Sequence, residues 1–355
     1  MRRSLILLVA LVAACSSGPS TTSSTAPPAG STTTSEPVTT TSTMVSTTTS
    51  LPSLSPGDLV LPVATGSMPD TWRELFTIPY GETPETLGTS LGGDGEGVYW
   101  GPEYGAQAPD GSWWFLDTAK YRLAHFDADG EYIEEVAVPT EMLVNGVYFQ
   151  WTFPKVMRNG TVLAARITGG THYIRYRDGK LDGFEVPVAA VPRTDDGELV
   201  YAMDFEDSSL WAVDPRAATA ERTDTMRARD GSRFLLTVGP STIHLELPDA
   251  GTTVDMVFTA AGIGGNAHLS IEAVGDDEGN IHLFILGFPE ADESQQLAGY
   301  ARVTADGSVV ILEEMMSPFS LSDPGTPTRL GVTPGTSTPT YMVVGDEGVT
   351  VYTRD

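Results

Sequence analysis

The sequence predicts an all-β fold, a β-propeller built most simply from six four-stranded blades. Short runs of aromatic and β-branched residues, which favour strands, recur from Trp72 to the end of the chain. Turn-forming pairs such as Asp-Gly separate these runs, and no stretch of ten or more residues keeps the apolar period of a helix. Because sandwiches, barrels and propellers share these features, a longer period must distinguish them.

That longer period lies in the spacing of the turns, which recur in pairs. Asp110-Gly111 and Asp129-Gly130 lie 19 residues apart, and so do Asn159-Gly160 and Asp178-Gly179. The later pairs are Asp196-Gly197 with Asp214-Pro215, Asp230-Gly231 with Asp249-Ala250-Gly251, Glu278-Gly279 with Asp306-Gly307, and a shorter pair at Thr333-Pro334-Gly335 and Asp346-Glu347-Gly348. Each unit therefore holds four antiparallel strands in about 34 to 56 residues, which is the size of one propeller blade.

The two ends of the chain predict how the ring closes. The segment Arg73–Gly81 precedes the first full unit and resembles the strands that end the other units, whereas the last unit has no such strand before Asp355. We expect this N-terminal strand to complete the last blade, because pairing removes two exposed sheet edges. This gives six blades. Few residues lie between successive units at Ala217 to Arg229, so five or seven blades stay open as alternatives.

The N-terminus predicts export and lipidation. Residues 1–14 hold two arginines and a short apolar run that ends in small residues, the layout of a signal peptide. The junction Val12-Ala13-Ala14-Cys15 resembles a bacterial lipobox, and Cys15 is the one cysteine of the chain. We therefore expect a lipoprotein signal peptide and a lipid on Cys15. An ordinary signal peptide is the alternative.

A low-complexity tether follows. Residues 15–57 are rich in serine, threonine and proline, contain no aromatic residue, and carry a single charge at Glu36. Such a segment buries too little apolar area to offset its ordering entropy, so we expect it to be disordered. It resembles the tethers of actinobacterial lipoproteins. Residues 58–355 remain for the propeller.

The charge of the chain excludes some partners. The precursor has a formal charge of −27, and removing Arg2 and Arg3 with the signal peptide leaves 18 basic and 47 acidic residues, or −29. This charge argues against nucleic acid and against docking of the domain on anionic lipid. It is compatible with a polar neutral ligand or with a divalent cation.

No cofactor is predicted, although calcium or another divalent metal remains an alternative. The turns Asp127–Gly130 (DADG) and Asp276–Gly279 (DDEG) look like fragments of calcium loops, but neither continues to the glutamate that an EF-hand requires. Aspartate before glycine is also what a tight hairpin turn prefers. We therefore interpret both as hairpin turns.

The first unit has a more specific likeness. It runs from Gly101-Pro102 through the turn at Asp110-Gly111, the strand SWWFLD, Asp117, Arg122 and Phe126 to Asp129-Gly130. This order resembles an NHL-type blade. The resemblance implies a six-bladed propeller used mostly for binding, and it implies structural roles for Asp117 and Arg122.

Enzymatic motifs are nearly absent: the sequence has no GxSxG, HExxH, Walker-type loop or GxGxxG. Propellers bind ligands where the inner strands and their loops meet the central channel, so we looked at the segments that lead into the predicted inner strands. A glycine-rich loop adds one histidine as a further candidate. The candidate binding residues are Trp100, Glu103, Tyr104, Gln150, Trp151, His172, Asn266, His268 and Glu272.

These features predict a non-catalytic binding protein on the outer face of the cell membrane, held there by the lipid on Cys15. Its expected partner is an envelope glycan, a peptide or a protein. The alternative is a metal-dependent hydrolase that resembles the gluconolactonase family, six-bladed propellers with a divalent metal in the channel. That resemblance would assign ligand roles to residues such as Glu103, Asn266 and Asp204.

Overall fold

The computed structural model describes most of the chain after the tether. The described residues are 59–88, 90–91, 99–100, 105–143, 151–167, 171–186, 188–204, 207–260, 267–289, 296–316, 330–345 and 347–354. The predictions for the signal peptide, Cys15 and the tether lie outside them.

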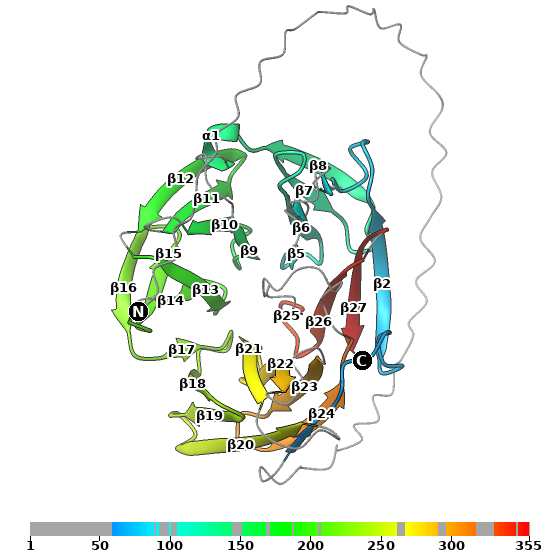
Figure 1. Ribbon diagram of the computed structural model, residues 1–355. Helices are drawn as coiled ribbons and strands as arrows, with labels where there is room; N and C mark the ends of the chain where they lie inside the picture. Colours follow the sequence, from blue (N-terminus) through cyan, green and yellow to red (C-terminus); the bar gives the residue numbers. More distant parts are fainter. Residues whose placement is uncertain are drawn as a thin grey trace, which may run out of the picture. The chain divides into compact units, whose positions relative to one another are not determined.

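Six blades of four antiparallel strands form the described ring (Figure 1). In five of them the four strands follow one another along the chain, and in the sixth an N-terminal strand joins three C-terminal strands. From the inner to the outer edge, blade 1 is β5 (Gly105–Gln107), β6 (Trp113–Asp117), β7 (Arg122–Phe126) and β8 (Tyr132–Ala137); blade 2 is β9 (Trp151–Val156), β10 (Val162–Ile167), β11 (Thr171–Arg177) and β12 (Lys180–Val186); blade 3 is β13 (Ala190–Asp195), β14 (Val200–Asp204), β15 (Leu210–Asp214) and β16 (Thr219–Thr223).

The other three blades complete the ring. Blade 4 is β17 (Met226–Arg227), β18 (Arg233–Gly239), β19 (Thr242–Leu247) and β20 (Thr252–Ala260); blade 5 is β21 (Ala267–Gly275), β22 (Ile281–Pro289), β23 (Leu297–Val303) and β24 (Val309–Glu314); blade 6 is β25 (Leu330–Val332), β26 (Pro339–Val344), β27 (Gly348–Arg354) and β2 (Trp72–Pro79). Neighbouring blades contact each other through their inner strands, including blades 6 and 1, except that blade 4 contacts β21 of blade 5 through β18 and β20. The prediction of a six-bladed propeller is confirmed.

The apolar core is divided among the interfaces between blades. One cluster joins blades 4 and 5, another joins blades 5 and 6, and others join blade 6 to blade 1, blade 1 to blade 2, and blade 2 to blade 3. A single blade therefore has two apolar faces that need neighbours, which is why the copies stack around an axis.

The N-terminal strand closes the ring as predicted. β2 pairs antiparallel with β27 from Trp72↔Arg354 to Pro79↔Gly348. Phe76, on β2, lies edge-on to Trp113 of blade 1, with ring centroids 5.7 Å apart. Gly130, in the β7–β8 turn, has a φ of 81°, and a Cβ there would lie 2.7 Å from the Phe76 ring. Glycine is required at this position both for the turn and for the close approach.

A second N-terminal strand was not predicted. β1 (Leu59–Leu61) pairs parallel with β20, at the outer edge of blade 4. Val63 and Thr65 then form isolated bridges with Leu297 and Met316 of blade 5 before the chain reaches β2. Residues before the first blade thus fasten blades 4, 5 and 6 in succession.

The remaining described elements are small. β3 (Ser90–Leu91) pairs with β4 (Tyr99–Trp100), and α1 (Thr140–Leu143) lies between blades 1 and 2. The last pair of predicted turns differs from the others, because the connection at Glu347-Gly348 joins the second and third strands of blade 6. Across the described ranges, no helix is long and apolar enough to cross a bilayer.

The structural roles that the NHL resemblance implied for Asp117 and Arg122 are confirmed. Arg122 Nε lies 3.0 Å from Asp117 Oδ2, and both side chains are buried. Asp117 also accepts a hydrogen bond from the backbone N–H of Gly88 at 3.0 Å, and Arg122 donates to the carbonyl of Pro84 at 3.0 Å. The pair ties the segment after β2 to blade 1.

Blade 5 contains a fully buried polar network. His282 Nε2 lies 2.9 Å from Asp276 Oδ2, and His282 Nδ1 lies 2.7 Å from the Tyr300 hydroxyl. A neutral imidazole satisfies both contacts when Nε2–H donates to the carboxylate and the tyrosine donates to Nδ1. Burial lowers the pKa of His282 more than the Asp276 carboxylate raises it.

This network makes stability depend on pH. Because the pKa of His282 lies below 6.5 in the folded protein, the unfolded chain binds the extra proton first as the pH falls. The stabilisation is complete above pH 6.5 and is lost below it, at up to about 1.4 kcal/mol per pH unit. Denaturant unfolding between pH 7 and pH 5 will show a smaller loss in His282→Gln than in wild type. Equal losses in the two proteins would contradict the prediction.

Candidate functional site

The inner strand of blade 4 is unusually short. β16 ends at Thr223 and β17 begins at Met226, so two residues connect the outer edge of blade 3 to the inner edge of blade 4. Three residue steps span at most about 10 Å, so Asp224 and Thr225 are used in crossing between the blades and leave no residue to extend β17 before Met226. β17 consequently pairs with β18 at Arg233 and Phe234, and not beyond.

The neighbouring strands respond to this gap. β13 of blade 3 contacts β21 of blade 5 directly, past the end of β17. The second strand of blade 4, β18, is half-buried or exposed from Leu235 to Gly239, and Val238 is 42% exposed. The second strands of blades 1 and 5 are, by contrast, buried at every position from Trp113 to Asp117 and from Ile281 to Gly287.

A cavity of about 600 Å³ occupies the space above β17. Three blades line it: β13, the β14–β15 end and the last residue of β16 in blade 3, β17 and β18 of blade 4, and the middle of β21 of blade 5. Nine of the lining residues are apolar and seven are polar or charged. The lining residues are Arg193, Met203, Ser208, Leu210, Thr223, Asp224, Met226, Leu235, Leu236, Thr237, Val238, Leu269, Ser270, Ile271, Glu272 and Ala273.

One arginine gives this cavity its chemical character. Arg193 lies on β13, and its Nε is buried without a hydrogen-bond partner in the part of the chain that the structure describes. Burial lowers the pKa of its guanidinium, and the Glu272 carboxylate opposes this shift. Glu272 itself accepts a hydrogen bond from the backbone N–H of Leu330 at 3.1 Å. Arg193 therefore contributes a half-buried guanidinium, with a buried and unpaired Nε, to a cavity wall of mixed polarity.

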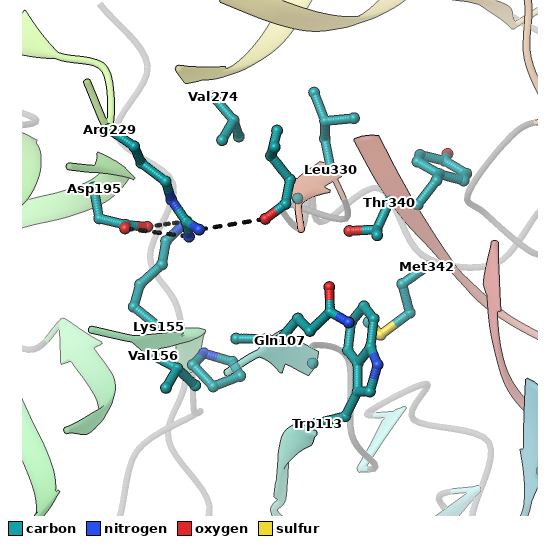
Figure 2. A pocket seen from close by; sticks show the side chains of 16 residues that line it. Gln107, Trp113, Lys155, Val156, Asp195, Arg229, Val274, Leu330, Thr340 and Met342 are labelled. Carbon is teal, nitrogen blue, oxygen red and sulfur yellow. Dashed lines mark hydrogen bonds and ion pairs between the residues drawn. The ribbon is translucent and has the colours of Figure 1, made fainter. Parts of the chain in front are cut away.

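Charged side chains lie at the opposite end of the channel, where the inner strands finish (Figure 2). Arg229 and Lys155 converge on Asp195: Arg229 Nη2 lies 3.5 Å from Asp195 Oδ1, and Lys155 Nζ lies 3.6 Å from Asp195 Oδ2. Arg229 Nη1 also donates to the carbonyl of Val332 at 3.4 Å. These contacts join blades 2, 3, 4 and 6 across the channel.

Little space remains around this charged cluster. Residues of all six blades surround it, including Gln107 of blade 1 and Val274 of blade 5, and the cavity left between them is about 40 Å³. That volume holds one or two water molecules. The described channel is thus filled at the end where its inner strands finish. It is hollow beside the part of β18 that β17 does not cover, so the larger cavity is the candidate binding site.

The structure brings one of the predicted residues, Glu272, to this cavity. His268 lies four residues earlier on β21, opposite Phe288, and Trp151 begins the inner strand of blade 2, opposite Arg166. Trp100 lies on β4, outside the blades. Glu103, Tyr104, Gln150 and Asn266 lie outside the described residues.

His172 lies away from the channel. It is on β11, the third strand of blade 2, so β9 and β10 separate it from the axis. Its Nε2 lies 3.6 Å from Glu185 Oε1 on the outermost strand, and its side chain is one-third exposed.

Several residues of the channel were missed. Arg193 and the edge of β18 line the cavity, and Lys155, Asp195 and Arg229 fill the far end. The sequence contained a signal for the cavity. The short connection within Ala217 to Arg229, which left the number of blades open, leads directly into the short strand β17. The charged cluster had no such signal, because its members lie in different blades.

The acidic turns are hairpin turns, as interpreted. Asp127 Oδ1 accepts the backbone N–H groups of Asp129 and Glu131, and Asp276 Oδ1 accepts those of Glu278 and Asn280. In the described parts of the chain, no three His, Cys, Asp or Glu side chains gather so that they could hold a metal ion.

Several solved structures are similar to this chain. A putative exported protein from Bacteroides fragilis has a TM-score of 0.45 and 9% identity, covering 84% of this chain and 99% of that one. A virginiamycin B lyase from Staphylococcus aureus has a TM-score of 0.39 and 12% identity, covering 75% and 97%. Regucalcin from Agrobacterium tumefaciens, a calcium-binding protein, has a TM-score of 0.36 and 15% identity, covering 82% and 94%.

At these identities the likeness concerns the fold and does not extend to ligand or chemistry. A comparison with curated proteins gave no match. The family model described as a domain of unknown function, DUF7485, matches residues 70–354, and the chain therefore belongs to that family.

Proposed function

We propose that this protein is a non-catalytic binding propeller whose ligand occupies the cavity above β17. The observation that carries this proposal is the 600 Å³ cavity beside blade 4, whose inner strand is the shortest of the six among the described residues. Its volume lies in the range of ligand pockets, and its lining combines apolar walls with polar groups, as such pockets do. The ligand has an apolar body and an acceptor group that Arg193 recognises.

A bulky residue inside the cavity tests this proposal. Ser270 is half-buried on the wall formed by β21, so Ser270→Trp fills the space while Ser270→Ala leaves it open. Wild type, Ser270→Ala and Ser270→Trp are applied to arrays of peptides, glycans and peptidoglycan fragments. We expect wild type and Ser270→Ala to retain the same ligand, and Ser270→Trp to bind it about tenfold more weakly or worse.

The melting temperature of each variant serves as the folding control. An array without any ligand, or a ligand held equally well by Ser270→Trp, contradicts the proposal. The hydrolase alternative is separated by metal content after dialysis together with lactone hydrolysis, which the binding proposal expects to be negative.

We also propose that the propeller acts outside the cell, tethered to the membrane through a lipid on Cys15. The support is the lipobox-like junction and the Ser/Thr/Pro-rich segment that precedes β1. Mass spectrometry of the mature protein checks this placement: an unmodified cysteine, or a mature chain that begins elsewhere, contradicts it.

A further inference from the structure

The strand β18 has a free edge on its inner side. On its outer side, Leu235 to Gly239 pair with β19 from Glu246 to Thr242. On its inner side, β17 pairs with Arg233 and Phe234. Within the described residues, no strand pairs with the five residues from Leu235 to Gly239 on that side, and four of them line the 600 Å³ cavity.

The register of the β18–β19 hairpin identifies the backbone groups at this edge. Gly239 and Thr242 flank a two-residue turn, so they exchange backbone hydrogen bonds, and so does every second pair along the ladder. Thr237 and Leu235 therefore direct their N–H and C=O groups toward β19. Leu236 and Val238 direct theirs toward the cavity. Phe234 directs its backbone groups to the same edge as Leu236 and Val238, and there it pairs with Met226 of β17.

An extended peptide is the ligand that matches these groups. A strand laid beside β18 continues the line of β17 and presents a donor and an acceptor at every second residue, with the spacing of a β-ladder. A glycan has no such backbone. Five free residues correspond to about 17 Å of strand, enough for four or five residues of ligand.

The cavity walls would take the side chains of such a strand. Side chains of a strand alternate between its two faces, so they would contact β13 on one side and β21 on the other. Leu269 and Ile271 of β21 offer apolar contacts, and Arg193 of β13 places a half-buried guanidinium in the cavity wall. A carboxylate is the group that a guanidinium binds best.

We propose that the cavity binds an extended, mainly apolar peptide segment carrying one acidic side chain, which adds to β18 as the missing upper part of the inner strand of blade 4. This inference rests on the proposed function, since it names the chemical class of the ligand for the same cavity.

The test uses the folded chain and one residue of the free edge. Val238→Pro removes the N–H that faces the cavity, and proline is tolerated at a strand edge when that N–H is not used by the sheet. Val238→Ala also removes the branched side chain of valine but keeps the N–H. The probe is a synthetic array of blocked hexapeptides with alternating apolar residues and one aspartate, each with its asparagine counterpart.

We expect at least one peptide to bind wild type and Val238→Ala within about threefold, and to bind Val238→Pro about tenfold or more weakly. Its asparagine counterpart will also bind more weakly. Hydrogen exchange of the Leu236 and Val238 amides will slow when the peptide is bound, while that of Leu235 and Thr237, which already pair with β19, will not change. A peptide N-methylated at the positions facing β18 will lose binding, which keeps the test independent of how the proline variant folds.

Different failures have different meanings. If a peptide binds but neither amide is protected, or Val238→Pro binds as well as Val238→Ala, strand addition is overturned while the cavity proposal stands. If only glycan fragments bind, and Ser270→Trp abolishes their binding, the peptide inference is again overturned alone. If no ligand of any class depends on the cavity, both proposals fail.

Discussion

Phe76→Ala will lower the free energy of unfolding by about 3–5 kcal/mol, the usual cost of deleting a buried phenylalanine side chain. Phe76 is 7% exposed and packs in the cluster that joins blade 6 to blade 1. Its strand, β2, is also the one that closes the ring across β27. The cavity left by the substitution therefore lies between blade 6 and blade 1, beside the pairing of β2 with β27 that joins the two ends of the chain.

Chemical denaturation of the purified protein measures this loss. Thr77→Ala on the same strand is the matched control, because Thr77 is exposed and its side chain bonds to Glu74 and Thr350 at the surface. We expect the control to change stability by less than about 1 kcal/mol. A loss of similar size in both variants would mean that packing of β2 against blade 1 does not stabilise the closed ring.

Asp276→Ala will cost about as much, roughly 3–5 kcal/mol, for a polar reason rather than an apolar one. The side chain of Asp276 is fully buried and accepts four hydrogen bonds, from the backbone of Glu278 and Asn280, from Asn280 Nδ2 at 2.8 Å, and from His282 Nε2 at 2.9 Å. Alanine leaves these donors buried without an acceptor, and each unpaired donor is costly away from water.

The equivalent turn on the other hairpin of blade 5 supplies the control. Asp306 accepts hydrogen bonds from Thr304 and Ser308 but is exposed, so water replaces the lost acceptor in Asp306→Ala. We expect a much smaller shift of the unfolding midpoint for Asp306→Ala than for Asp276→Ala, measured in the same denaturant. Shifts of equal size would show that burial of the Asp276 network adds nothing to turn formation.

Most of the fold could be predicted because the signals that specify it are local. Asp-Gly pairs favour hairpin turns through the backbone of two adjacent residues, and their spacing fixed the strands of blades 1 to 5. The closing role of Arg73–Gly81 followed from its likeness to the outer strands. β1 escaped prediction because Leu59–Leu61 is three residues long, too short to show the alternating pattern of a strand.

The candidate site was predicted less well. Of the predicted residues in the segments leading into the inner strands, Glu272 on β21 lies in the wall of the cavity. Arg193 was missed because an isolated arginine in a strand is usually exposed at the surface. Its burial depends on Glu272 and on the gap in blade 4, neither of which is near it in sequence.

The sequence by itself determined most of the strands, the turns and the strand that closes the ring, and it favoured six blades, since each of these depends on residue types at fixed short spacings. The tertiary structure alone decided where the ring is hollow and where it is filled. Lys155, Asp195 and Arg229 meet at one end of the channel because three blades converge there, and the cavity lies where the two residues of β17 leave most of the inner edge of β18 unpaired. Both outcomes depend on distances between segments far apart in the chain, which a pattern of neighbouring residues does not contain.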